Sequence, residues 1–151
     1  MSYMPESMPP EVKSAFATYR EANALLGEQL LLCRELIFDA AGTVDEIGTI
    51  TETLKWGQPS YLTEATGSGS TIRLAPAEME AASGGVATTK PALFVHCATD
   101  LIEQFKTFYP ATFDYQGKRA LVIRDDIAAV REELRHCMAL ALTYKLRKRK
   151  V

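Results

Sequence analysis

Two amphipathic stripes bracket a run of short strand-like segments, and this order constrains the fold more than any other feature of the 151-residue chain. In an amphipathic helix, apolar residues recur at three- and four-residue steps and form the face that packs on a core. The N-terminal stripe consists of Val12, Phe16, Tyr19, Leu26, Leu30, Cys33, Ile37 and Ala40. The C-terminal stripe consists of Ile127, Val130, Leu134, Cys137, Ala141 and Tyr144. The pattern predicts a long helical region at each end.

Gly27 interrupts the N-terminal stripe. A glycine inside a helix costs about 1 kcal/mol relative to alanine. We therefore expect a kink, or two consecutive helices, near this residue. Pro9 and Pro10 suit the start of the region, and Gly42 suits its end.

The segment between the stripes is rich in β-branched residues and turn formers. Strands are predicted at 49–56, around 61–62, at 71–74 and at 91–97, with turns at 56–59 and 66–70. A helix is predicted from an N-cap at Thr99 to the residue before Pro110. Residues 113–123 resemble a hairpin that turns at Gln116 and Gly117.

Short connections between strands favour antiparallel pairing, and long terminal helices can cover one face of the resulting sheet. The sequence therefore predicts an α+β fold: an antiparallel sheet of about five to six strands, with N- and C-terminal helices packed on one face. Residues 75–90 are small and flexible in composition, so we expect a surface excursion with one helical turn at 77–81.

The composition, 47% hydrophobic and 24% charged, is ordinary for a globular domain. We expect a flexible N-terminus at 1–10, a single domain at 11–146 and a basic C-terminal tail at 147–151. No apolar run approaches the roughly 20 residues of a membrane span, and no secretory signal opens the chain. Cys33, Cys97 and Cys137 lie in apolar segments and are expected to be reduced core thiols. These features predict a cytoplasmic protein with no membrane partner.

The basic residues are concentrated at the C-terminus. Five of the 17 lie in residues 145–151, so the other 144 residues carry 12 basic and 19 acidic side chains, a net charge of −7. Nucleic-acid binding needs a broad basic surface, which only the tail offers. We interpret the tail as a favourable cationic helix end; the alternative is a tether to nucleic acid or another acidic partner.

Catalytic and cofactor motifs are sparse. His96 and Cys97 are neighbours on a predicted strand and should point to opposite faces, and His136 is expected to pair with Glu132 beside a buried Cys137. Three cysteines and two histidines include no spacing typical of a zinc site. No nucleophile elbow, P-loop or dinucleotide-binding fingerprint occurs, so no cofactor is predicted.

Three acidic pairs offer oxygen ligands for a hard cation: Asp125 with Asp126, Asp45 with Glu46, and Glu132 with Glu133. Each pair also has a purely structural interpretation. The first begins a helix, the second belongs to a capping box, and the third lies on a solvated helix face. Asp125 and Asp126 are the candidate metal ligands.

The strongest candidate surface is the sheet face away from the helices. Alternation places Leu93, Val95 and Cys97 toward the core, so Ala92, Phe94 and His96 point outward, as does Arg73 between Ile72 and Leu74. Trp56 and Tyr61 flank the turn at Gly57 and Pro59, which can hold both rings at the rim of this face. A cation, an imidazole and aromatic rings would bind a small anionic or aromatic ligand. Alternatively, the two rings simply cover the open face of the sheet.

Several stretches resemble the bacterial YdhG-like domain of unknown function. The resemblance runs from about Leu30 to Tyr144 and depends most on Trp56, Gly57, Pro59 and Tyr61, which form a W-G-x-P-x-Y element, with further support from Gly117, Arg119 and Ala120. It implies a small intracellular α+β domain, and an iron-chaperone role like that of frataxin, which uses exposed acidic residues. The acidic residues here are scattered, and the excursion at 75–90 is longer than the connection the family usually has.

The leading hypothesis is a non-enzymatic binding domain for a small ligand or a protein partner. Its candidate ligand-binding residues are Trp56, Gly57, Pro59, Tyr61, Arg73, Phe94, His96 and Arg119. Iron binding through surface carboxylates is the first alternative. An enzyme that uses a histidine–arginine pair for acid–base chemistry is the second. An uncovered sheet face would also suit a homodimer.

Overall fold

The computed structural model describes residues 7–80, 88–124 and 126–149. Its helices are α1 (Pro10–Ala22), α2 (Ala24–Gly42), α3 (Leu101–Phe108), α4 (Arg131–Leu142) and α5 (Tyr144–Arg149), with 3₁₀ turns at Asp45–Ile47 and Ile127–Val130. Its strands are β1 (Thr51–Lys55), β2 (Gln58–Leu62), β3 (Ile72–Met79), β4 (Thr88–Phe94), β5 (Asp114–Gln116) and β6 (Ala120–Val122).

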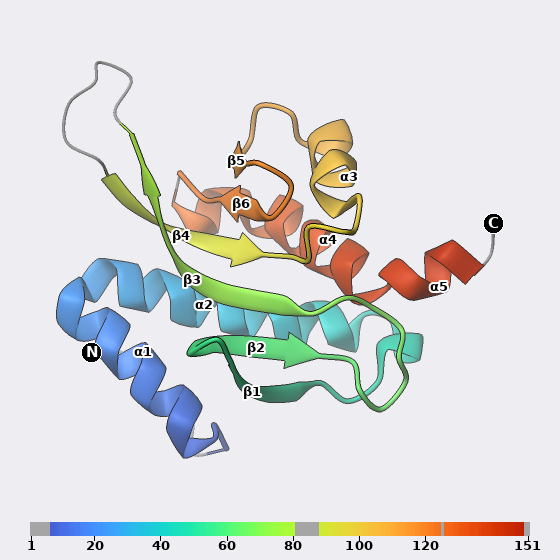
Figure 1. Cartoon of the computed structure of the whole chain (residues 1–151), viewed down its shortest axis with the longest axis horizontal. Helices are drawn as coiled ribbons and strands as arrows, with labels where there is room; N and C mark the ends of the chain where they lie inside the picture. Colours follow the sequence, from blue (N-terminus) through green and yellow to red (C-terminus); the bar gives the residue numbers. More distant parts are fainter. Residues whose placement is uncertain (1–6, 81–87, 125, 150–151) are drawn as a thin grey trace.

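The six strands form one antiparallel sheet in the order β1-β2-β3-β4-β6-β5 (Figure 1). Every neighbouring pair runs antiparallel, as the short connections predict. The predicted α+β class and strand number are confirmed.

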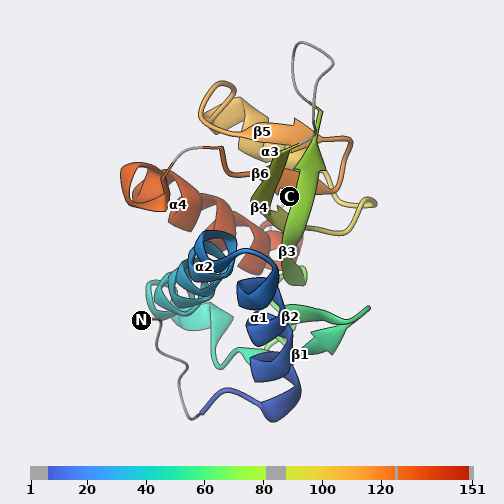
Figure 2. The ribbon, with the colours of Figure 1, turned by 90° about the vertical axis from the view of Figure 1, so that its left-hand side faces the viewer.

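The helices α1, α2 and α4 lie together on one side of the sheet, and the tip of the β1–β2 hairpin projects to the other side (Figure 2). The main core lies between these layers and combines helix residues such as Phe16, Leu36 and Leu134 with the strand residues Leu74 and Leu93. The predicted helical cover of one face is therefore confirmed. The opposite face carries a second, smaller cluster of Ala77, Ala92, Ala120 and Val122.

The N-terminal helical region breaks at Asn23, four residues before the glycine that predicted a break. Asn23 has extended backbone angles and accepts a hydrogen bond from the Leu26 N–H at 3.1 Å, so it caps α2. Gly27 lies inside α2, where a Cβ atom would stand 2.7 Å from the Cα of Arg20. The glycine permits α1 and α2 to approach closely.

The β1–β2 hairpin closes in two residues. Lys55 pairs with Gln58, and the residues between them both have positive φ, 57° at Trp56 and 72° at Gly57. Two positive φ angles define the type I′ turn that matches strand twist. Glycine adopts this conformation readily, whereas a bulky tryptophan rarely does.

The predicted excursion at 75–90 is wrong in its described part. β3 continues to Met79 and β4 begins at Thr88, with pairs from Ala75↔Ala92 to Met79↔Thr88. Pairing between adjacent strands overrides the weak strand preference of alanine and glutamate. Residues 81–87, which include the end of the expected helical turn, lie outside the described residues.

At both ends of the chain, ordered structure reaches further than the sequence predicted. Met8 is buried in the core, and α1 already begins at Pro10. At the other end, α5 reaches Arg149, and Arg147 donates from Nη2 to the Leu140 carbonyl at 2.6 Å. This contact places a cation at the end of α4, in agreement with the helix-end interpretation of the basic tail. No helix within the described ranges is long and apolar enough to cross a membrane.

Candidate functional site

Two adjoining cavities open on the sheet face away from the helices, and three residues line both: Trp56, Arg73 and His96. The larger, about 490 Å³, is here called the α5 cavity and is also lined by Lys55, Gly69, Ser70, Thr71, Thr99, Tyr144 and Lys145. The smaller, about 420 Å³, is called the Arg119 cavity and is also lined by Val95, Cys97 and Arg119. Both volumes suit small molecules.

Arg73 is held over the face of the sheet by its neighbours on adjacent strands. It pairs with Phe94 of β4, and its guanidinium carbon lies 5.7 Å from the centroid of that ring. On the other side, its Nη1 donates to Gln58 Oε1 at 2.8 Å. Among the described residues no carboxylate pairs with this positive charge, and the two contacts orient it toward the cavities.

Trp56 comes from the tip of the hairpin and is 87% exposed. Its backbone is held in the left-handed region by the two-residue turn, so the position of the ring is set by the hairpin. An exposed indole gains little from the core. The ring is therefore available to a ligand in either cavity.

His96 follows the end of β4 and accepts a hydrogen bond at Nδ1 from the Ala98 N–H, 3.0 Å away. A neutral imidazole that accepts at Nδ1 carries its proton on Nε2. Thr99 Oγ1 donates to the His96 carbonyl at 2.7 Å and holds the same turn. The exposed imidazole thus presents an N–H donor at the junction of the two cavities.

Arg119 lies in the loop between β5 and β6, and its carbonyl accepts a hydrogen bond from the Val95 N–H at 2.8 Å. This contact ties the loop to the end of β4 and brings two guanidinium groups to one cavity. Burial, and to a smaller degree the positive charge of Arg119, lower the pKa of Arg73. Two like charges at a cavity wall attract a counter-anion.

Tyr144 and Lys145 bring the C-terminal helix into the site, which the sequence alone did not predict. The N–H of Lys145 donates to the Ser68 carbonyl at 2.9 Å, and Ser68 Oγ donates to the Leu142 carbonyl at 2.9 Å. The loop before β3 therefore fixes the start of α5 beside the sheet. The local signals in this segment were the place of Tyr144 at the end of the C-terminal stripe and the run of basic residues from Lys145, and neither indicates a position beside the outer face.

The charged residues that line the two cavities are all basic: Lys55, Arg73, Arg119 and Lys145. Across residues 7–80, 88–124 and 126–149, none of these four forms an ion pair. Most of the chain is acidic by comparison, because 144 residues carry a net charge of −7. The site concentrates positive charge where the rest of the domain does not.

Tyr61 does not belong to this surface. It is fully buried on the helix-covered face, where its ring meets Phe38 edge to face at 5.9 Å and its hydroxyl donates to Glu52 Oε2 at 2.8 Å. The reason is register: Tyr61 pairs with Ile72, and cross-strand partners share a face. Its placement at the rim of the outer face is wrong.

Of the other predicted ligand-binding residues, some line the cavities and some only support the residues that do. Pro59 is buried opposite Leu54, and Gly57 shapes the turn without lining either cavity. Phe94 supports Arg73 from below and also does not line them. The structure thus brings together Trp56, Arg73, His96 and Arg119 from the predicted set.

The cysteine and histidine expectations are partly corrected. Cys33 and Cys137 are buried, and burial raises the pKa of the Cys33 thiol to about 12. Cys97 is exposed and lines the Arg119 cavity with His96, because β4 ends at Phe94 and strand alternation no longer applies. His136 contacts the Tyr109 hydroxyl at 2.7 Å, whereas Glu132 pairs with Arg135.

The candidate metal ligands receive no structural support. Asp125 lies outside the described residues, and Asp126 is exposed. Within the part of the chain that the structure describes, no group of three or more His, Cys, Asp or Glu side chains could hold a metal ion. The iron alternative stays a prediction from the resemblance.

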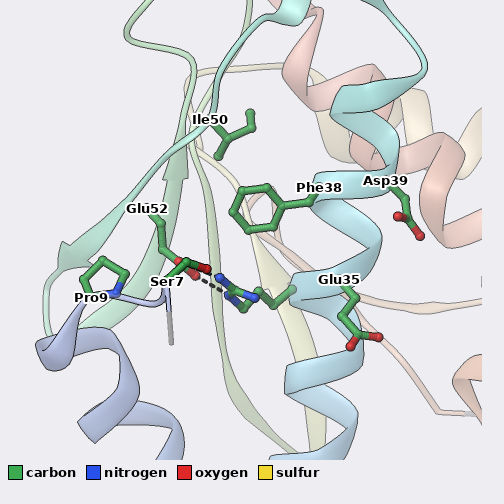
Figure 3. Close-up of a pocket in the computed structure, with 8 residues that line it drawn as sticks. Ser7, Pro9, Glu35, Phe38, Asp39, Ile50 and Glu52 are labelled. Atoms are coloured by element: carbon green, nitrogen blue, oxygen red, sulfur yellow. Dashed lines mark hydrogen bonds and ion pairs between the residues drawn. The ribbon is translucent and has the colours of Figure 1, made fainter. Parts of the chain in front are cut away.

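A third cavity, about 650 Å³, opens between α1, α2 and β1 (Figure 3). Arg34 donates to Glu52 on its wall, from Nε to Oε2 at 2.5 Å and from Nη2 to Oε1 at 2.8 Å. Tyr61 also donates to this carboxylate, and Asp39 pairs with Arg131. Arg34, Glu52 and Asp39 are thus neutralised by partners within the protein, and the other charged residue on the wall, Glu35, is acidic. Among the described residues this cavity therefore has no unpaired cation on its wall, unlike the two on the outer face.

Compared with known proteins, the chain matches no family model, no curated protein and no solved structure. By its fold and its site, the chain is an α+β domain with two adjoining basic cavities on the sheet face away from the helices. The resemblance to the YdhG-like domain remains a sequence-based prediction.

Proposed function

We propose that this protein is a binding domain for a small anionic molecule, held on the outer sheet face between Trp56, Arg73, His96 and Arg119. The observation that carries the proposal is the convergence of Lys55, Arg73, Arg119 and Lys145 on two cavities. In the part of the chain that the structure describes, none of these cations forms an ion pair and no acidic side chain lines either cavity. A cavity lined by one sign of charge concentrates ligands of the opposite sign.

The imidazole of His96 and the indole of Trp56 provide two further contacts for the ligand. The Nε2–H of His96 is a directional donor to an anion oxygen, and the exposed Trp56 ring offers a flat apolar contact. Binding requires no cofactor and no covalent step. An acid–base enzyme would use the same residues, so turnover of a bound anion would be the sign of that alternative.

The sole tryptophan makes the test direct, because its fluorescence reports on the site alone. Titration with inorganic phosphate, sulfate and citrate is expected to change the emission of Trp56 in a saturable way. Arg73→Gln and Arg119→Gln should each weaken binding about tenfold or more, since a charge-assisted hydrogen bond is lost. Higher salt should weaken binding as well.

Arg135→Gln is the matched control, because it removes a cation of α4 that lines neither cavity. Its affinity for the anions should equal that of the unmodified chain. Saturable binding that both arginine variants leave unchanged, or no binding of any anion at low salt, would exclude the proposal.

A further inference from the structure

The cavities on the outer face are two compartments of one site, because the same three side chains form the boundary of both. Trp56, Arg73 and His96 line each of them. A ligand seated beside the indole therefore reaches the Arg119 cavity on one side and the α5 cavity on the other. The site suits an elongated molecule with chemically different parts.

The Arg119 cavity favours a compact group with more than one negative charge. Two guanidinium groups and the Nε2–H of His96 converge there, and neither arginine is neutralised by a carboxylate in the described residues. A phosphate monoester carries about −1.5 to −2 charges at neutral pH and has three acceptor oxygens. Each guanidinium group can donate two parallel hydrogen bonds to two oxygens of a phosphate. Two guanidinium groups therefore suit a phosphate with three acceptor oxygens better than a carboxylate, which has two.

The α5 cavity has a different composition. It holds the hydroxyl-bearing residues Ser70, Thr71 and Thr99, the ring of Tyr144 and two lysines at its margin. Hydroxyl and phenol groups bind sugar hydroxyls or ring heteroatoms, and lysines hold a further negative charge. The indole at the boundary offers a stacking surface for a planar ring, and it is 87% exposed.

We infer that the ligand of the proposed anion site is a phosphorylated small molecule with an aromatic ring, of the nucleoside monophosphate class. The phosphate occupies the Arg119 cavity, the ring stacks on Trp56, and the remaining polar part reaches the α5 cavity. This inference rests on the proposed function and names its ligand class.

The C-terminal basic segment gains a role in this arrangement. Ser68 fixes the first residues of α5 through two backbone hydrogen bonds, from the N–H groups of Lys145 at 2.9 Å and Leu146 at 3.1 Å. Lys145 is thereby anchored at the wall of the site. It contributes to the same ligand as Arg73, although the two residues lie 72 positions apart in sequence.

The test compares adenosine monophosphate, adenosine and inorganic phosphate as probes of the full chain, by calorimetry and by Trp56 fluorescence. Adenosine monophosphate is expected to bind at least tenfold more tightly than either of the other two. Arg119→Gln should reduce the affinity for adenosine monophosphate and inorganic phosphate alike. Trp56→Leu should reduce the affinity for the nucleotide toward that of phosphate, measured by calorimetry.

Lys145→Gln should weaken nucleotide binding severalfold, with Lys106→Gln as a control on α3 that lines neither cavity. Thermal melting checks that each variant is folded. If the Arg73 variants do not fold, Arg119→Gln alone tests the contribution of the arginines to binding.

Equal affinity for nucleotide and inorganic phosphate would overturn the inference and leave the anion-binding function standing. Absence of binding by all three probes would overturn both. Tighter binding of an eight-residue oligothymidylate than of the mononucleotide would overturn the inference in favour of single-stranded nucleic acid.

Discussion

Arg34 of α2 and Glu52 of β1 form a two-bond ion pair, and both side chains are less than a tenth exposed, at 9% and 7%. Tyr61 donates a third hydrogen bond to the same carboxylate. A buried pair is sensitive to the loss of one partner, because the other charge then stays in a medium that solvates it poorly. The pair also links α2 to β1, two elements that the sequence separates.

Arg34→Met is expected to lower the free energy of unfolding by about 3–5 kcal/mol, since it leaves Glu52 buried and unpaired. The double variant Arg34→Met with Glu52→Leu should recover part of that loss, because no charge is left buried, although the Tyr61 hydroxyl loses its acceptor. Urea unfolding of both, with Arg131→Met as the control, measures the difference. Arg131 pairs with Asp39 where both side chains are about half exposed, so its loss should cost at most about 1 kcal/mol. Equal costs for Arg34→Met and Arg131→Met would contradict this account.

Gly27→Ala and Gly42→Ala test the packing of α1 against α2. A Cβ atom at Gly27 would lie 2.7 and 2.8 Å from the Cα and N of Arg20, and this backbone cannot move independently of α1. We expect a loss of about 1–3 kcal/mol despite the gain in helix propensity. At Gly42 no atom lies within 4 Å, so alanine should stabilise by about 0.5–1 kcal/mol. Stabilisation by both variants, measured by urea unfolding, would show that the two helices do not need the glycine.

The face of the sheet on which a side chain lies was predictable where apolar and polar residues alternate along the strand without interruption. Ile72, Leu74, Leu93 and Val95 entered the core as their spacing requires, and this fixed Arg73 on the outer face. Tyr61 was misplaced because its face depends on the register between β2 and β3, which local sequence does not encode. The residues around it offered turn signals and no alternation.

Contacts between distant segments account for what the sequence did not show. Lys145 reaches the site through hydrogen bonds to Ser68, and Arg34 meets Glu52 across two layers. Neither contact has a periodic or spaced signature, because each is set by how the elements pack. The strands at 75–79 and 88–90 were missed for a related reason: their pairing, rather than their composition, makes them strands.

Trp56→Asn is expected to stabilise the protein while it weakens nucleotide binding toward the affinity for inorganic phosphate. A non-glycine residue with φ of 57° costs about 1–2 kcal/mol, and asparagine before glycine is the preferred pair for a type I′ turn. Thermal unfolding followed by circular dichroism should show a gain of about 1 kcal/mol. Trp56→Phe, which keeps an aromatic ring at the same φ, should leave stability within about 0.5 kcal/mol of the original. A destabilised asparagine variant would mean that the indole contributes packing in the free protein.

Alkaline pH is expected to destabilise the fold through groups that stay protonated in the core. Burial raises the pKa of Cys33 from 9.0 to about 12 and that of Tyr19 from 10.0 to about 12. Between the ordinary and the raised values the unfolded chain loses these protons and the folded chain keeps them. The free energy of unfolding should therefore be unaffected by these two groups below about pH 8. Above its ordinary pKa, Cys33 should lower it by up to about 1.4 kcal/mol per pH unit, and the half-buried Tyr19 should lower it by less, because solvent reaches part of its side chain.

Urea unfolding between pH 7.5 and 10.5 measures this slope, and Cys33→Ala should make it shallower because one of the titrating groups is gone. Ile37→Val is the matched control: it also truncates a fully buried side chain of α2, at a cost of about 0.5–1.5 kcal/mol, but removes no proton. Its stability should lie below that of the original chain by the same amount at every pH. A Cys33→Ala variant whose slope equals that of Ile37→Val would show that the Cys33 thiol does not resist ionisation, and that the alkaline loss arises from the other groups whose pKa burial raises, such as Cys137 and Tyr19.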